Sequence, residues 1–334
     1  MSTRPLADHI ASTRSSATLV ARRSFLLGTV GALAAGCTKT AARPSQASKP
    51  QSPVGRYASA NPGSVNSLWL RAPKGLVVVD AQRTLSDAHR AVAQIQGEGR
   101  PVAAILITHS HPDHVGGLGV FRAAFPSAPV FASAATVELM RSDPRKFYAL
   151  TRDQLGADYP EQITLPDHSF SPGATLDAGG LQLATAQFGP GESDVADVYY
   201  EPDSGALFCG DLASTKATPA LLEGHSCGWL TNLQRLRRQF PQARTIYPGH
   251  GDPGQGTDLL DQQITYIQQL RALVRSAEPS GGELDPAATR SVLTAMDSRY
   301  PGYPSVASLP NMAQLNVAAV GKEMRTETDC CCGT

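Results

Sequence analysis

Three histidines and one aspartate lie close together in the segment His109-Ser110-His111-Pro112-Asp113-His114 of this 334-residue chain. His109 and His111 are two residues apart, so on an extended segment their side chains point to the same side and can share one metal ion. Asp113 and His114 follow the bend at Pro112 and face a second ion. The alternative, a surface loop that is histidine-rich by chance, is poorly supported because the whole chain has only eight histidines. The spacing therefore predicts a site for two metal ions.

Short apolar segments precede this motif and two other groups of candidate ligands. Residues 105–107 (Ile-Leu-Ile) come before His109, residues 206–208 (Ala-Leu-Phe) before Asp211, and residues 245–247 (Thr-Ile-Tyr) before His250. Apolar runs of this length that end near Gly or Pro are typical of buried strands. We therefore expect the ligands to lie on loops at strand ends, where a rigid core can bring them to one site.

These motifs carry a resemblance to a known family. The segment THSHPDHVGG at 108–117 resembles the HxHxDH signature of the metallo-β-lactamase superfamily of hydrolases. Three more segments resemble family motifs in the family's order. They are KGLVVVD at 74–80, an early strand that ends in a structural aspartate, FCGD at 208–211, whose aspartate bridges both metals, and YPGHG at 247–251, which supplies the last histidine. The resemblance extends over about residues 64–254, and it implies an α/β fold, an αββα sandwich with a binuclear site at its edge.

One family motif is changed in this chain. Where the family usually has a GHT segment whose histidine completes the first metal site, this chain has Gly191-Glu192-Ser193, and no histidine occurs between residues 168 and 225. We predict Glu192 as the ligand, because carboxylate oxygens bind divalent cations and alkylsulfatase-like members are similar in using a glutamate in this region. Asp194 and Asp197 are the alternative ligands, and a solvated acidic turn is the third interpretation.

The resemblance and this substitution together give the predicted ligands: His109, His111, Asp113, His114, Glu192, Asp211 and His250. Three carboxylates and a bridging hydroxide would balance the charge of two divalent cations, whereas a histidine at position 192 would leave one positive charge. More anionic ligands make the metals weaker Lewis acids. Zinc is the expected metal, and the oxygen ligands make iron or manganese more competitive. Asp113 is also expected to orient the nucleophile.

The resemblance implies an enzyme, a metal-dependent hydrolase in which a metal-bridging hydroxide attacks a small-molecule ester, lactone or thioester. Hydrolysis of β-lactams is less expected, because lactamases of this fold typically lack the bridging aspartate that Asp211 supplies. Two alternatives stay open, an iron-dependent oxygenase or oxidoreductase of the same fold and a noncatalytic metal-binding lipoprotein. His111 argues against the flavodiiron pattern, in which a glutamate is usual at this place.

The N-terminal residues predict export. Residues 22–27 (Arg-Arg-Ser-Phe-Leu-Leu) resemble a twin-arginine signal, and residues 33–37 resemble a lipobox that ends at Cys37. We therefore expect a signal over residues 1–36 and a flexible tether over 37–60, with the protein exported by the twin-arginine route and lipid-anchored to the membrane on its periplasmic or other extracytoplasmic side. A retained membrane anchor and an unused N-terminal tail are the alternatives.

The rest of the chain is expected to form a catalytic domain over residues 61–256, a helical extension over 257–326 and a cysteine-rich tail over 327–334. The extension either covers the mouth of the site, with Tyr300 and Tyr303 in a connecting loop, or packs on the sandwich without contacting substrate. In the tail, Cys330, Cys331 and Cys332 lack the spacing of a structural zinc site. Removing residues 1–36 leaves 25 basic and 28 acidic residues, a balance that argues against nucleic acid as a partner.

Overall fold

The computed structural model describes residues 54–60, 65–278, 283–307, 309 and 311–326. All of them belong to one compact unit within residues 50–334. The predicted export signal over 1–36, with Cys37 and most of the tether, lies outside the described residues, and so does the cysteine-rich tail. None of the helices in the described part of the chain is long and apolar enough to cross a membrane.

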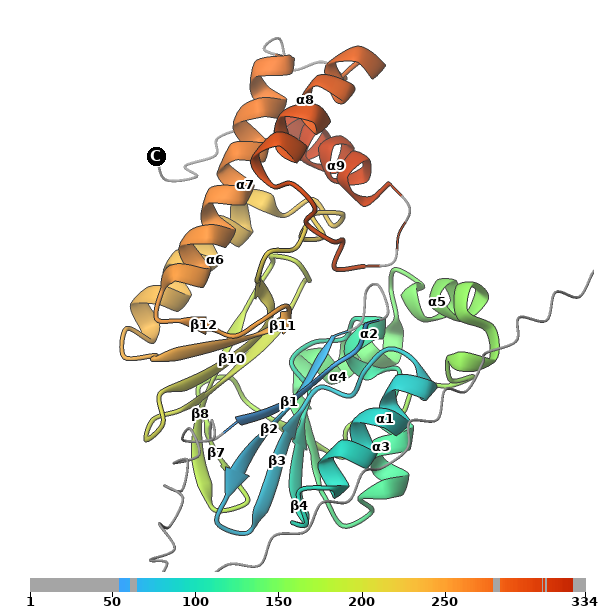
Figure 1. Cartoon of the computed structure of the whole chain (residues 1–334), viewed down its shortest axis with the longest axis vertical. Coiled ribbons are helices and arrows are strands. Elements are labelled where there is room, and N and C mark those ends of the chain that lie inside the picture. Colours follow the sequence, from blue (N-terminus) through green and yellow to red (C-terminus); the bar gives the residue numbers. More distant parts are fainter. Residues whose placement is uncertain (1–53, 61–64, 279–282, 308, 310, 327–334) are drawn as a thin grey trace, which may run out of the picture. The chain divides into compact units, whose positions relative to one another are not determined.

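Two six-stranded sheets form the centre of the fold (Figure 1). In the first sheet the strand order follows the sequence; β1 to β3 are antiparallel and β3 to β6 are parallel. Its strands are β1 (Val54–Ala58), β2 (Asn66–Ala72), β3 (Gly75–Val79), β4 (Val102–Leu106), β5 (Val130–Ser133) and β6 (His168–Phe170). In the second sheet only β10 and β11 pair in parallel. Its strands are β7 (Thr175–Ala178), β8 (Leu181–Phe188), β9 (Ala196–Glu201), β10 (Ala206–Ser214), β11 (Thr245–His250) and β12 (Gly254–Gln255).

Alternating side chains of the central strands enter different cores. In β3, Val77 and Val79 join Leu106 of β4 and Phe208 of β10 in a core between the sheets, whereas Val78 packs in a core on the outer face of the first sheet. A strand that is covered on both faces has no polar side, which explains why the run 76–79 is uninterrupted Leu and Val.

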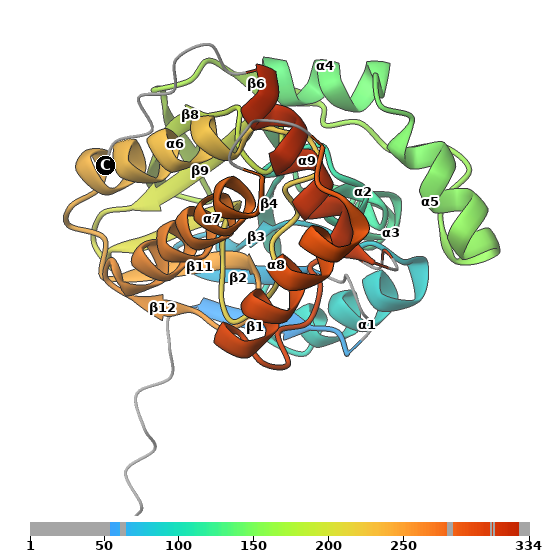
Figure 2. The same ribbon diagram turned by 90° about the horizontal axis from the view of Figure 1, so that it is seen from above.

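Helices cover the outer face of each sheet (Figures 1 and 2). Over the first sheet, α1 buries Ala88, Ala91, Val92 and Ile95, which recur at helical spacing. The helices of this half are α1 (Leu85–Gln96), α2 (Pro112–Val115), α3 (Leu118–Ala124), α4 (Ala134–Ser142) and α5 (Phe147–Leu155). The second sheet is covered by a core that includes residues of α6 (Ser226–Gln239), α7 (Asp258–Ala277), α8 (Pro286–Arg299) and α9 (Met312–Thr326). The layers confirm the predicted αββα sandwich with a helical C-terminal extension.

The first strand begins earlier than the sequence suggests. Residues 54–58, which the composition places in the flexible tether, form β1 and pair with β2 in a register that places Val54 opposite Leu70. Val54 is buried in the core between the sheets. A strand at the edge of a sheet shows only weak apolar alternation in its sequence, so it is hard to distinguish from a tether.

Candidate metal centre

The HxHxDH segment follows strand β4 and is held in place by a buried aspartate at the end of β3. The carboxylate of Asp80 accepts hydrogen bonds from the backbone N–H of Thr108 at 2.9 Å and from its hydroxyl at 2.8 Å. The same carboxylate lies 2.8 Å from Nδ1 of His114. Because a carboxylate can only accept, Nδ1 carries the proton and Nε2 of His114 is left as a lone-pair donor for a metal.

Glu192 joins His109 and His111 in a first group of potential ligands. Its Oε2 lies 3.4 Å from Nε2 of His109, and its Oε1 lies 3.0 Å from Nδ1 of His111. One ligand atom from each of the three residues lies within 4.8 Å of the others. Glu192 comes from the connection between β8 and β9, so the turn that carries the changed motif does reach the two histidines.

The second group contains the other four predicted ligands. His250 is at the end of β11, and its Nε2 lies 3.0 Å from Oδ2 of Asp113 and 3.1 Å from Oδ2 of Asp211. Nε2 of His114 lies 3.3 Å from Oδ1 of Asp211. The ligand atoms of this group also lie within 4.8 Å of one another. All seven predicted residues therefore belong to these two groups, and His109/His111 and Asp113/His114 divide as the spacing predicted. Asp211, which the resemblance gives as a ligand of both metals, lies in the second group.

Buried polar atoms in both groups fit a metal. Four buried atoms make no hydrogen bond within the described part of the chain, although they face one another in two pairs at 3.4 and 3.3 Å. They are Nε2 of His109 with Oε2 of Glu192, and Nε2 of His114 with Oδ1 of Asp211. A buried polar atom without a hydrogen bond costs about 1–3 kcal/mol, so four of them at one place are consistent with a cation between them. Imidazole nitrogens and carboxylate oxygens are the ligands of zinc and of similar divalent cations.

Burial and mutual charge shift the pKa values of these groups in the metal-free protein. Burial lowers the pKa of His109 well below its usual value, and the nearby imidazoles of His114 and His111 add to the effect. Burial raises the pKa of Glu192 to about 7, although His111 acts against it. Burial would lower the pKa of His250, but Asp211 and Asp113 outweigh it and raise that pKa to about 10. Metal binding must therefore displace protons from this site.

Two glycines allow the chain to pass close to the ligands. A Cβ atom at Gly249 would lie 1.9 Å from Oδ1 of Asp211, closer than any contact allows. Gly210 has φ +52°, and a Cβ there would lie 2.7 Å from Oγ1 of Thr108. The glycines of the FCGD and YPGHG segments thus serve the packing of the ligand loops.

One carboxylate that was not predicted from the sequence contacts His111 on the ring nitrogen opposite to Glu192. Oε1 of Glu223 lies 3.0 Å from Nε2 of His111, which leaves Nδ1 of His111 directed at Glu192. Arg145 lies 2.9 Å from the other oxygen of Glu223 and pairs with Asp194 at 3.0 Å. Glu223 belongs to the loop before α6, and its contact with His111 spans 112 residues, so no local pattern could have indicated it.

The alternatives to Glu192 have other partners. Asp194 pairs with Arg145, and Nε2 of His225 lies 3.1 Å from it. Asp194, His225 and Glu223 form a third group with potential ligand atoms, at the side of the site. The carboxylate of Asp197 accepts hydrogen bonds from the backbone of Ser133 at 2.8 Å and from the hydroxyl of Thr136 at 2.9 Å. Neither aspartate belongs to the two groups of predicted ligands.

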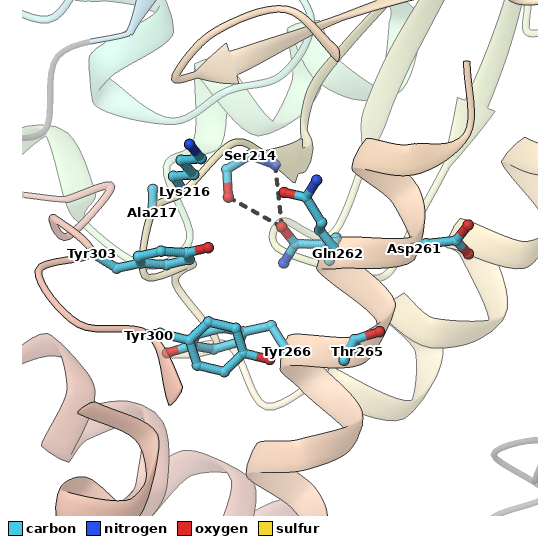
Figure 3. A pocket seen from close by; sticks show the side chains of 10 residues that line it. Ser214, Lys216, Ala217, Asp261, Gln262, Thr265, Tyr266, Tyr300 and Tyr303 are labelled. Atoms are coloured by element: carbon cyan, nitrogen blue, oxygen red, sulfur yellow. Dashed lines mark hydrogen bonds between the residues drawn. The ribbon is translucent and has the colours of Figure 1, made fainter. Parts of the chain in front are cut away.

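A cavity of about 340 Å³ opens above the ligands. Its floor includes His111, Asp113, Glu192 and Asp211, and its walls come from α5 and from the segment between α8 and α9. Part of the C-terminal extension therefore reaches the site through Val306, Ala307 and Leu309. Tyr300 and Tyr303 do not line this cavity. They face another one, of about 410 Å³, beside Tyr266 and Lys216 (Figure 3).

The fold and the site define an αββα metalloprotein with two groups of metal-ligand side chains. Not all of these ligands lie on loops at strand ends as expected, because Asp211 is within β10 and Asp113 and His114 are in α2. Residues 60–250 match the family described as "Metallo-beta-lactamase superfamily", and the chain belongs to this superfamily. This assignment confirms the predicted family.

Individual relatives agree with the assignment to this superfamily. The chain is 34% identical over 171 residues to a hydroxyacylglutathione hydrolase from Synechococcus sp., a match that covers 49% of this chain and 57% of the relative. It is 23% identical over 239 residues to a linear primary-alkylsulfatase from Pseudomonas sp., covering 61% of this chain and 45% of the relative. The chain thus spans about half the length of these relatives. A metallo-beta-lactamase family protein from Thermus thermophilus shares the fold, with a TM-score of 0.58, 22% identity, and coverage of 81% of this chain and 92% of that chain.

Proposed function

We propose that this chain is a metal-dependent hydrolase that binds two divalent cations, with zinc expected first and iron or manganese as alternatives. The observation that carries the proposal is the convergence of seven imidazoles and carboxylates, several with buried atoms that make no hydrogen bond, in two groups of which four members line one cavity. His109, His111 and Glu192 would hold one cation, and Asp113, His114, Asp211 and His250 the other. When bound, such a pair of cations lowers the pKa of water and polarises a substrate oxygen.

The residues suggest how the substrate and the attacking water are handled. Asp113 is the least buried of the ligand carboxylates, and it lines the cavity while one of its oxygens lies 3.0 Å from His250. It can therefore accept a hydrogen bond from the attacking water and orient it toward a carbonyl carbon. Glu223 and Asp80 hold the rings of His111 and His114 in the orientation that ligation needs.

An ester, lactone or thioester is the proposed substrate class. The Synechococcus relative is named for the hydrolysis of an acyl compound, which supports an acyl substrate. Sulfate esters are the second candidate, because Arg83 lines the cavity and gives a cation for a sulfate group, and because the Pseudomonas relative is named an alkylsulfatase.

A panel of esters, lactones, thioesters and alkyl sulfates, assayed with metal-loaded and metal-free protein, tests the proposal. We expect turnover only with metal, and its loss in His109→Ala and Asp211→Ala variants that stay folded. Bound metal without turnover on any class would favour the noncatalytic metal-binding lipoprotein. Iron with a visible absorption band and oxygen consumption would favour the oxygenase or oxidoreductase.

We also propose that the protein is exported by the twin-arginine route and is lipid-anchored on the periplasmic or other extracytoplasmic side of a membrane. The motifs at residues 22–27 and 33–37 support this location. Replacing Arg22 and Arg23 by lysine should keep the precursor in the cytoplasm, and Cys37→Ser should release the exported protein from the membrane. Membrane retention of the Cys37→Ser protein would contradict the lipid anchor.

A further inference from the structure

The cavity above the metal ligands has a polar floor and apolar walls. Phe147 and Leu150 of α5 form one wall, and Leu222 and Val306 form part of the other. Among the described residues that line the cavity, Arg83 is the only cation other than histidine. A molecule that enters the cavity therefore meets hydrocarbon at the walls and the ligand side chains at the floor.

Helix α5 turns one face toward the cavity. Phe147, Leu150, Thr151 and Gln154 all line it, and their spacing places them along a single side of the helix. No residue of α5 is fully buried. Leu150 is 60% exposed, and Leu309 at the opposite rim is 39% exposed. Large apolar side chains that remain exposed around a cavity indicate a surface that a ligand covers.

The opposite wall is held firmly by the fold. Val306 and Ala220 are buried in a small apolar cluster with Met312 of α9, and Leu222 packs against this cluster. The backbone of Val306 donates a hydrogen bond to the carbonyl of Thr218 at 3.1 Å, and the backbone of Thr218 donates to the carbonyl of Pro304 at 2.7 Å. This wall is therefore positioned before any ligand enters.

We infer that the substrate carries an apolar chain, which lies between α5 and the wall formed by Leu222 and Val306 while its ester group reaches the ligand residues. The inference rests on the hydrolase activity proposed above. A cavity of about 340 Å³ is within the usual range of small-molecule sites. Each methylene group that leaves water for such a wall should raise kcat/KM about fourfold.

The p-nitrophenyl esters acetate, butyrate, hexanoate and octanoate test this inference with the zinc-loaded protein. p-Nitrophenyl octanoate has six more methylene groups than the acetate ester, so complete burial of all six would raise kcat/KM about four-thousandfold. Burial of only part of the chain lowers this figure, and we expect a ratio of about a hundredfold or more. Leu150→Glu places a charge on the wall and should lower this ratio at least tenfold. Leu315→Glu is the matched control, because Leu315 is 43% exposed on α9 and does not line the cavity, so it should leave the ratio unchanged.

Calorimetry with the free carboxylates octanoate and acetate, titrated into the zinc-loaded protein, separates the apolar site from the proposed hydrolase activity. If no ester is hydrolysed but octanoate binds more tightly than acetate and Leu150→Glu removes the difference, the hydrolase proposal fails and the apolar site stands. If the esters are hydrolysed with equal kcat/KM, or if Leu315→Glu changes the ratio as much as Leu150→Glu, the inference is overturned and the hydrolase proposal stands. Equal or absent binding of octanoate and acetate, without any hydrolysis, overturns both.

Discussion

Replacing Glu192 by glutamine tests the feature that distinguishes this site. The substitution keeps an oxygen at the same place but removes one negative charge from a side chain that is only 5% exposed. Even a singly charged cation about 4 Å from a carboxylate interacts with it by about 4 kcal/mol at an effective dielectric constant of about 20, and this value is a lower bound for a divalent cation. That energy corresponds to almost a thousandfold in a binding constant, and the remaining amide oxygen should recover part of it. We therefore expect the first cation to bind about a hundredfold more weakly. The cation held by the group around His250 should bind with unchanged affinity.

The metal content after dialysis against a competing chelator is the assay. The native protein should retain two zinc ions per chain and the Glu192→Gln protein one. Asp194→Asn is the matched control, because Asp194 is two residues away and pairs with Arg145 and His225 instead of His109 and His111. Two tightly bound ions in the Glu192→Gln protein would refute the assignment of Glu192 as a ligand, and loss of an ion from the control would transfer that role to Asp194.

Glu192→His completes this test. A histidine restores the nitrogen ligand that is usual in the superfamily, so both ions should be retained. The site then gains one positive charge relative to the native protein, which favours deprotonation of the attacking water. The acidic limb of the pH-rate profile should therefore move to lower pH. An unchanged profile with both ions bound would contradict the charge argument.

Three further predictions concern the surroundings of the ligands and the outer surface of the first sheet. Glu223→Gln should weaken binding of the first cation about tenfold in a chelator competition without unfolding the protein, and unchanged affinity would show that the contact with His111 is not needed. Gly249→Ala should displace Asp211 and cost about 1–3 kcal/mol in the free energy of unfolding, together with loss of the second cation from the metal analysis. A hydrogen bond from Arg71 lowers the pKa of Glu98 below its usual 4.5, so this pair stabilises the fold above pH 4.5 and the gain is lost as the pH falls through the lowered value. Glu98→Gln should lower the free energy of unfolding by about 0.5–1 kcal/mol at neutral pH and leave it unchanged in acid, as measured by denaturant unfolding. An equal loss at both pH values would exclude the pair with Arg71 as its cause.

Much of the site could be predicted from the sequence because its motifs come after apolar runs that form buried strands. His109, Asp211 and His250 each follow or end a buried apolar run, and the local backbone then directs them to the same edge of the sandwich. The prediction for Glu192 required the family motif that the chain resembles and a count of residues back from Glu201-Pro202. Its oxygens lie within 3.4 Å of the two histidines that it was expected to join.

Other features depended on contacts between distant parts of the chain. The pairing of β1 with β2 turned part of the expected tether into a strand, because Val54 could be buried only once the sheets were stacked. The extension reaches the cavity through Val306, whereas Tyr300 and Tyr303, its most conspicuous side chains, face a different cavity. Which residues of a loop face a site depends on how that loop packs, and the loop sequence does not record it.

The sequence by itself determined the residue types and the order of the ligands, since their spacing along strands and turns is a local property of the backbone. Only the tertiary structure decided what surrounds them. The contact of Glu223 with His111 joins residues 112 positions apart, and the apolar cavity arises where α5 faces the segment between α8 and α9. Both result from the packing of whole elements, which minimises exposed apolar surface over the entire chain and leaves no signature in any short stretch of it.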